Sequence, residues 1–174
     1  MKSNFTTNIK KNPLIAKRDN LTNEITRNWK IIKTENVVKK GFTRNYEIDA
    51  LFNYTLSLYD QLTIVKLRIQ CKNMGIRIKD LPADANIINI YKLSALNEYY
   101  VKLGELMQYP YTIDPVLKAK KGKKGLSVTE KLTRNFLREK QIACNLRLNE
   151  LRKKIADFND NMEEEDEVPL FLTA

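Results

Sequence analysis

The sequence predicts an all-α protein, an elongated bundle of three to four long helices built around a central antiparallel hairpin. Apolar residues recur at three- and four-residue spacing in four segments, and no strand pattern of comparable length appears. The 174 residues are 43% hydrophobic and 30% charged, which is enough apolar material for one core. We therefore expect a flexible N-terminal arm at 1–12, a helical domain at 13–158 and an acidic, hydrophobic tail at 159–174.

The first helix is expected to begin at Pro13, because Asn12 is a good N-cap and proline suits the first helical position. The spacing carries this helix to about Lys33 or Lys40. Gly41 then ends the helix or the turn after it. The apolar stripe of the helix consists of Leu14, Leu21, Ile25, Trp29 and Ile32.

Two further helices, near 45–75 and 84–107, are expected to form the central hairpin. Gly75 lacks a Cβ and suits a left-handed C-cap for the first of them. The stripe of that helix includes Ile48, Leu51, Leu58, Leu62, Val65 and Ile69. The seam of the second contains Leu93, Leu96, Tyr100, Leu103 and Met107. We expect these apolar faces to form the core or an interface between copies of the chain.

The fourth helix is expected at about 127–158, since Ser127 and Glu130 have the spacing of a capping box. Its seam consists of Leu137, Cys144, Leu148, Leu151, Ile155 and Phe158. The two cysteines, Cys71 and Cys144, both fall on apolar helical stretches. Buried free thiols are favoured over a disulfide for this pair.

Positive charge is concentrated in the two outer parts of the chain. The net charge is +10, divided as +17 over residues 1–156 and −7 over the remainder. Within the basic part, residues 1–44 carry +8, residues 45–112 carry 0 and residues 113–156 carry +9. If the first and fourth helices pack on the same side of the hairpin, their charges would merge into one surface suited to phosphates.

The strongest candidate for nucleic-acid binding is a flexible, lysine-rich loop at 116–126. The loop contains Lys118, Lys120, Lys121, Lys123 and Lys124. The basic residues that follow it, Lys131, Arg134 and Arg138, are included in the predicted site. Ammonium groups spaced by glycines can follow a phosphate backbone without reading bases. An anionic protein partner or simple solvation would also explain such a loop. It does not fit a Walker phosphate loop, because Leu117 replaces the first glycine and Lys124 replaces the required Ser or Thr.

Tyr109 and Tyr111, just upstream of the lysine-rich loop, and Phe42, close to Arg44, could stack on single-stranded nucleic acid or could simply pack. In the tail, five consecutive acids precede Val168, Pro169, Leu170 and Phe171. This pattern resembles, in type, the partner-recruiting tails of bacterial single-stranded-DNA-binding proteins. It is also similar to the short Leu-Phe peptides that dock on bacterial sliding clamps, although Glu167 stands where those peptides usually carry Gln. The segment 163–172 could dock on another protein, lie on the chain's own basic face, or remain disordered.

Several function classes are disfavoured by composition. The absence of His removes the usual catalytic triads, His metal sites and His pH switches. The helix acids Asp49, Asp60, Glu98 and Glu105 imply no paired catalytic site by their spacing. We expect no enzyme activity, metal or cofactor. Without a signal segment or an apolar run long enough to cross a membrane, the chain is expected in the cytoplasm or inside a virion or other particle.

The sequence therefore predicts a non-catalytic accessory protein that binds nucleic acid nonspecifically and a protein partner through the helices at 45–107 or the tail. An AT-rich codon bias, visible in abundant Asn, Ile and Lys, resembles that of low-GC bacteria and their phages, and suggests a phage or mobile-element protein. The alternative is a structural component of a larger complex or virion. In that case the chain would form homo-oligomers through its apolar helix faces.

Overall fold

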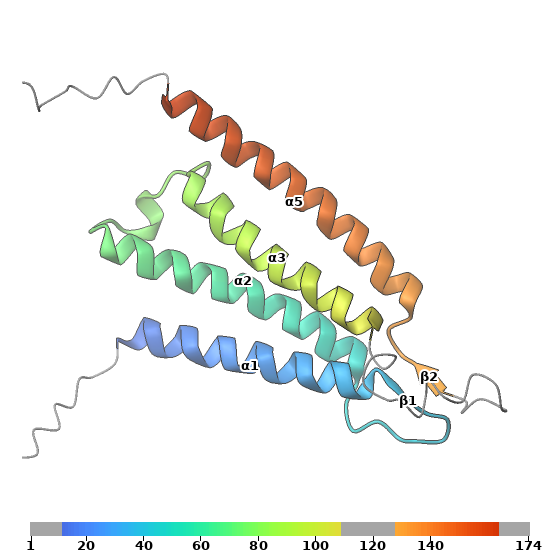
Figure 1. The fold of residues 1–174 in the computed structure, drawn as a ribbon. Coiled ribbons are helices and arrows are strands. Elements are labelled where there is room, and N and C mark those ends of the chain that lie inside the picture. The colour runs from blue at the N-terminus through green and yellow to red at the C-terminus, as the bar shows by residue number, and fades with distance from the viewer. Residues whose placement is uncertain (1–11, 109–127, 164–174) are drawn as a thin grey trace, which may run out of the picture.

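The computed structural model describes residues 12–108 and 128–163. Most of these residues lie in four long helices, as Figure 1 shows: α1 (Pro13–Glu35), α2 (Ile48–Asn73), α3 (Asn86–Gln108) and α5 (Arg134–Glu163). A short 3-10 helix, η1 (Ile78–Asp80), lies between α2 and α3. The strands β1 (Val37–Lys39) and β2 (Val128–Glu130) pair antiparallel. The prediction of a mostly helical chain is confirmed. The prediction of an all-α chain is wrong in one respect, because it did not include this two-stranded sheet.

Two helix ends follow the predicted capping chemistry. The side-chain Oδ1 of Asn12 accepts a hydrogen bond of 3.1 Å from the Leu14 amide at the start of α1. At the end of α2, Gly75 has a φ of +71°. The Ile76 amide donates to the Cys71 carbonyl at 3.0 Å, and the Gly75 amide donates to the Lys72 carbonyl at 3.2 Å. This pair of bonds is the Schellman arrangement, which requires the left-handed backbone that glycine adopts at little cost.

The predicted capping box at the start of the fourth helix is wrong. Residues Val128–Glu130 form β2, and α5 begins at Arg134. The Thr133 hydroxyl caps the helix, accepting from the Phe136 amide at 3.3 Å. The reason is tertiary, because the backbone groups of residues 128–130 pair with β1 and are unavailable for a helical turn.

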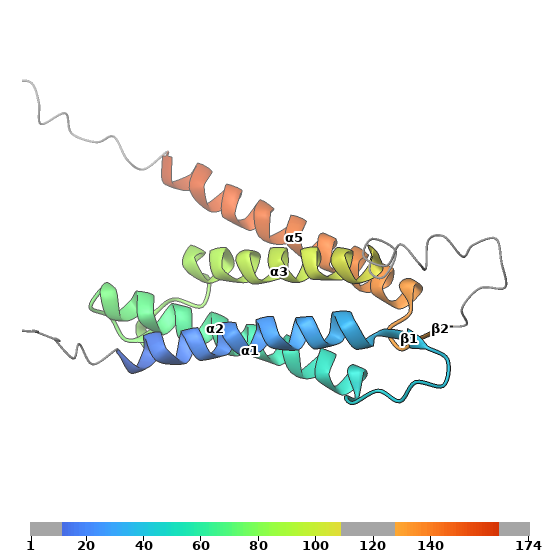
Figure 2. The same ribbon diagram turned by 60° about the horizontal axis from the view of Figure 1, so that its bottom comes forward.

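The helices pack most extensively in two pairs, α1 along α2 and α3 along α5. The predicted central hairpin of α2 and α3 does contact, but less extensively than either pair. Figures 1 and 2 show α1 and α5 on opposite sides of the molecule. Within the described ranges these two helices make no contact with each other. The condition for a merged basic surface along the first and fourth helices is therefore not met.

An aromatic cluster joins the four helices, with one ring from each. The Phe52 ring of α2 lies 5.8 Å from Trp29 of α1, 6.2 Å from Tyr99 of α3 and 5.9 Å from Phe136 of α5, centroid to centroid. Such edge-on and tilted contacts add to the free energy of burying the rings. The predicted stripe of α1 is confirmed at Leu21, Ile25, Trp29 and Ile32, which are buried, whereas Leu14 is only half-buried.

Of the predicted seam of α3, Leu103 is buried, whereas Leu93, Leu96, Tyr100 and Met107 are half-buried. Leu103 and Leu106 are buried, and Ala95, Tyr99 and Met107 pack against the core from the same helix. The backbone of α3 also accepts hydrogen bonds from α5 at Leu96 and Tyr100. Their carbonyl oxygens accept from Cys144 Sγ at 3.4 Å and from Gln141 Nε2 at 3.4 Å. Both Cys71 and Cys144 are free and buried, as predicted.

Candidate nucleic-acid interface

Most of the predicted binding residues lie outside the ranges that the structure describes. Lys118, Lys120, Lys121, Lys123 and Lys124, together with Val168, Pro169, Leu170 and Phe171, lie outside the described residues, as do Tyr109 and Tyr111. The remaining three, Lys131, Arg134 and Arg138, are described and exposed. They lie at and just after β2, so their surroundings are set by the small sheet.

The sheet joins two parts of the chain that are far apart in sequence. Val38 is opposite Thr129, and Lys39 is opposite Val128. Asn36, only 3% exposed, fixes this junction with both ends of its side chain. Its Nδ2 donates to the Leu132 carbonyl at 3.1 Å, and its Oδ1 accepts from the Leu132 amide at 2.6 Å. The segment after α1 is therefore held beside the start of α5.

Arg44 strengthens the same junction. Its Nε donates to the Glu35 carbonyl at 2.9 Å, and its Nη2 donates to the carbonyls of Asn36 and Thr129 at 3.0 and 2.8 Å. Because this guanidinium donates hydrogen bonds to three backbone carbonyls, it holds the backbone of the two segments together. We therefore assign Arg44 a structural role rather than direct contact with phosphate.

Exposed basic and aromatic side chains surround this junction, and we call the set the basic end. It consists of Lys39, Lys40, Phe42, Tyr46, Lys131, Arg134 and Arg138. Phe42 is 58% exposed and Tyr46 is 48% exposed, which leaves both rings accessible. Lys39, Lys40 and Tyr46 were not predicted to bind nucleic acid from the sequence, although the Lys-Lys-Gly-Phe turn at 39–42 was a readable signal.

Acidic residues moderate the charge of the basic end. Lys131 Nζ pairs with Asp49 Oδ2 at 3.0 Å, and Glu35 accepts hydrogen bonds from the Asn45 amide and side chain. Because both members of the Lys131 pair are exposed, the ammonium remains able to exchange partners. The chain between Gln108 and Val128, whose described ends both lie at the sheet side of the molecule in Figure 2, adds five lysines and one acid. That segment carries a net charge of +4.

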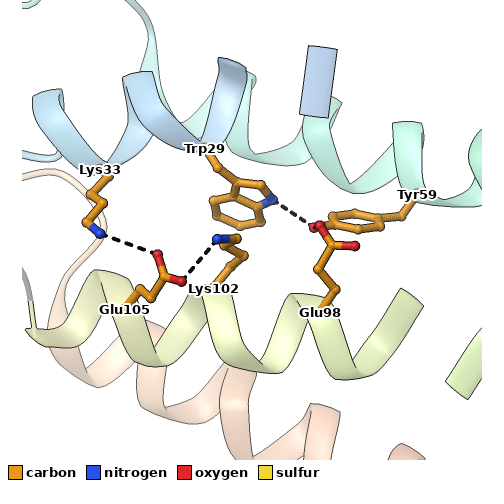
Figure 3. Close-up of polar contacts among 6 residues, drawn as sticks. All are labelled: Trp29, Lys33, Tyr59, Glu98, Lys102 and Glu105. Atoms are coloured by element: carbon orange, nitrogen blue, oxygen red, sulfur yellow. Dashed lines mark hydrogen bonds and ion pairs between the residues drawn. The ribbon is translucent and has the colours of Figure 1, made fainter. Parts of the chain in front are cut away.

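A polar groove of about 330 Å³ lies between α1 and α3. Figure 3 shows its two sets of contacts. The Trp29 indole Nε1 donates to the Tyr59 hydroxyl at 2.9 Å, and that hydroxyl donates to Glu98 at 3.0 Å. The two carboxylate oxygens of Glu105 accept from Lys33 at 3.3 Å and from Lys102 at 3.0 Å.

The electrostatics of the polar groove favour a structural role. Burial, together with the Glu98 charge, raises the pKa of Tyr59 far above its ordinary value, so its hydroxyl stays protonated. Burial would also raise the pKa of Glu105, but hydrogen bonds and charges from Lys102 and Lys33 together lower it. The spacing of Glu98 and Glu105 in the sequence predicted no paired site, whereas the fold places both residues in one groove. Each already accepts a hydrogen bond, so the pair is suited to joining α1, α2 and α3 rather than to acid–base chemistry.

A larger groove of about 660 Å³ opens between α2, α3 and α5, and we call it the apolar groove. Its apolar and aromatic lining is contributed by Leu56, Tyr59, Ile64, Leu67, Ala95, Leu96, Tyr99 and Leu151. Charged residues at its margin are Asp60, Lys92, Arg147, Glu150 and Lys154. Burial raises the pKa of Tyr99 to about 12, so this side chain is neutral in the groove at physiological pH. Sequence reasoning assigned no role to the bases at this margin.

The chain matches no protein-family model, no curated protein and no solved structure. Among the described residues, no group of three or more cysteines and carboxylates is placed to hold a metal ion. No helix in the described ranges has an apolar stretch long enough to cross a membrane.

Proposed function

We propose that this chain is a non-catalytic accessory protein that binds nucleic acid nonspecifically through its basic end. One observation carries the proposal: the β1–β2 pairing holds the segment after α1 beside the start of α5. Exposed bases from both outer parts of the chain therefore lie at one end of the molecule, where α3 ends and β2 begins (Figure 1). Ammonium groups contact phosphates without reading sequence.

The exposed rings favour single strands over duplexes. Phe42 and Tyr46 lie on the turn and loop that follow β1, close to Lys39 and Lys40 in the chain. Base stacking on an aromatic ring contributes about 1–3 kcal/mol per base and tolerates any sequence. A paired base in a duplex offers no free face, so these rings would add affinity only for unpaired nucleotides. An accessory role in a phage or mobile element, with the protein in the cytoplasm or inside a particle, would fit the AT-rich composition.

The test is binding of labelled 20-nucleotide single-stranded DNA, RNA and duplex DNA, followed by fluorescence anisotropy at about 50 mM salt. We expect the double variant Phe42→Ala, Tyr46→Ala to weaken single-strand binding about tenfold or more and to leave duplex binding nearly unchanged. Phe158→Ala, which removes an exposed ring at the far end of α5, is the matched control. Undetectable binding to all three probes, or binding indifferent to salt, would refute the proposal.

A second candidate function, an assembly component, is favoured by exposed apolar residues on α5. Ile142 is 57% exposed and Leu146 is 60% exposed, and their four-residue spacing puts them on one face. Val101 on α3 is 55% exposed. If these residues form a contact between copies, light scattering should give an oligomer at about 10 µM. The variant Ile142→Asp, Leu146→Asp should then be monomeric, whereas a monomeric wild type would exclude this function.

A further inference from the structure

The apolar groove has the size and the lining of a docking site. Ile64 on its lining is 45% exposed, and Leu56, Leu96 and Leu151 there are only half-buried. The volume of about 660 Å³ falls within the range of about 300–1,000 Å³ typical of ligand pockets. Phe158, seven residues after Leu151, extends the apolar line along the same side of α5 and is 42% exposed.

The charges at the margin define what should bind there. Lys92, Arg147 and Lys154 outnumber the acids Asp60 and Glu150. Lys92 comes from α3 and the other two bases from α5, so positive charge lies on both of these helices. A suitable occupant is therefore a short apolar segment that carries acidic residues at one end.

Only one of the three chain segments outside the described residues has that composition. Residues 1–11 contain three lysines and no acid, and residues 109–127 contain five lysines and one acid. Residues 164–174 contain four acids and no base, followed by five consecutive apolar residues from Val168 to Leu172. Charge complementarity thus selects the C-terminal segment.

The chain length permits this segment to reach the groove of its own molecule. α5 ends at Glu163, nine residues or about 14 Å beyond Lys154. Leu170 is seven residues beyond Glu163, a span of up to about 23 Å in extended form. A reversal of direction after Glu163 would bring the apolar residues level with Leu151. It would bring the acids level with Lys154.

We propose that residues 168–172 bind in the apolar groove of the same chain, with Glu164–Glu167 facing Lys92 and Lys154. The groove begins about nine residues, or 14 Å, along α5 from Arg138. The acidic segment then covers the apolar groove and does not compete with nucleic acid at the basic end. This proposal is independent of the proposed function, because either can fail alone.

A photocrosslinking experiment on the full chain tests the proposal. A photoreactive benzoylphenylalanine replaces Phe171, and cross-linked peptides are mapped by mass spectrometry at about 2 µM protein. We expect cross-links within one chain to Ile64, Leu96 or Leu151. Cross-links to residues 37–46 or 109–127, cross-links only between chains, or no cross-link at all would overturn the proposal.

Charge reversal at the groove margin provides the second arm. The variant Lys92→Glu, Lys154→Glu should reduce the cross-link yield at least fivefold. Lys153→Glu, at an exposed position next to Lys154 that does not line the groove, should leave the yield unchanged. Equal yields in the two variants would contradict the proposed charge contact. Circular dichroism confirms that both variants keep their helices, so that a lost cross-link is not a folding defect.

Methyl NMR of the wild-type chain gives an independent readout. The substitutions Leu170→Ser and Phe171→Ser together should shift the methyl signal of Ile64. Phe5→Ser, which removes an aromatic residue from a different segment, should not shift it. An Ile64 signal that is identical in all three proteins would overturn the proposal.

Discussion

The Tyr59 hydroxyl connects three helices through a buried hydrogen-bond chain from Trp29 to Glu98. Tyr59→Phe would leave the buried Trp29 indole N–H without its partner. We expect the free energy of unfolding to fall by about 1–3 kcal/mol, measured by urea denaturation. Tyr54→Phe removes a hydroxyl that bonds Glu24 at the surface, and should cost less than about 0.5 kcal/mol. Equal losses in the two variants would contradict the role given to Tyr59.

Asn36 is the residue on which the junction between β1 and α5 depends. Asn36→Ala removes both hydrogen bonds to Leu132 and leaves its amide and carbonyl unpaired in a buried place. We expect a loss of about 2–4 kcal/mol in thermal or chemical unfolding. Asn135→Ala, at an exposed position near the start of α5, is the control and should change stability little. A small loss at Asn36 would mean that the sheet does not hold this end together.

Glu105 makes stability depend on pH in a definite direction. Because its pKa is lowered in the folded chain, the ionised carboxylate stabilises the fold above its ordinary pKa of 4.5. This contribution disappears as the pH falls through the lowered pKa, where folded and unfolded chains both bind the proton. Glu105→Gln should therefore lower the melting temperature at pH 7, and the difference from wild type should shrink as the pH falls below 4.5 and through the lowered pKa. A difference that grows on acidification would contradict this linkage, and Glu139→Gln on the exposed face of α5 serves as control.

At the scale of elements, local chemistry predicted the helix ends that depend on neighbouring residues. The start of α1 depends on Asn12 and Pro13, and the end of α2 depends on Gly75. In both cases the contacts that fix the helix end lie within a few residues. The start of α5 was misplaced because Ser127-Val128-Thr129-Glu130 satisfies a capping box in sequence, while a distant strand recruits the same backbone. A three-residue strand carries no periodicity that sequence could reveal.

The glycine at the end of α2 gives a prediction at this scale. Gly75→Ala places a Cβ on a residue with φ of +71°, although no atom lies within 4 Å of the added carbon. The cost is then conformational, and we expect a loss of about 1 kcal/mol in unfolding free energy. Gly75→Asn should cost less, because asparagine adopts left-handed backbone more readily. A Gly75→Ala variant as stable as wild type would show that the backbone there relaxes.

At the scale of the whole molecule, the distribution of charge was readable but its arrangement was not. Composition located positive charge in residues 1–44 and 113–156. The expected route to one surface was packing of the first and fourth helices, whereas α1 and α5 lie apart. The two basic segments meet instead through β1 and β2, whose partners are separated by about 90 residues. No local signal in the sequence predicts such a pairing. The apolar groove could not be predicted either, because it depends on how α2, α3 and α5 are arranged in space.

The salt dependence of single-strand binding tests the central claim most directly. The wild type is compared with a variant in which glutamine replaces Lys118, Lys120, Lys121, Lys123 and Lys124. The control variant carries glutamine at five bases of α2 and the η1 region, near the opposite end of the molecule: Lys66, Arg68, Lys72, Arg77 and Lys79.

Each phosphate contact with a single strand contributes about 0.7 to the slope of log affinity against log salt. We predict that the lysine-segment variant loses about 2–3.5 from the magnitude of this slope, and that the control variant keeps nearly the wild-type slope. Equal slopes for the two variants would contradict binding at the basic end, because net charge alone would then explain the affinity.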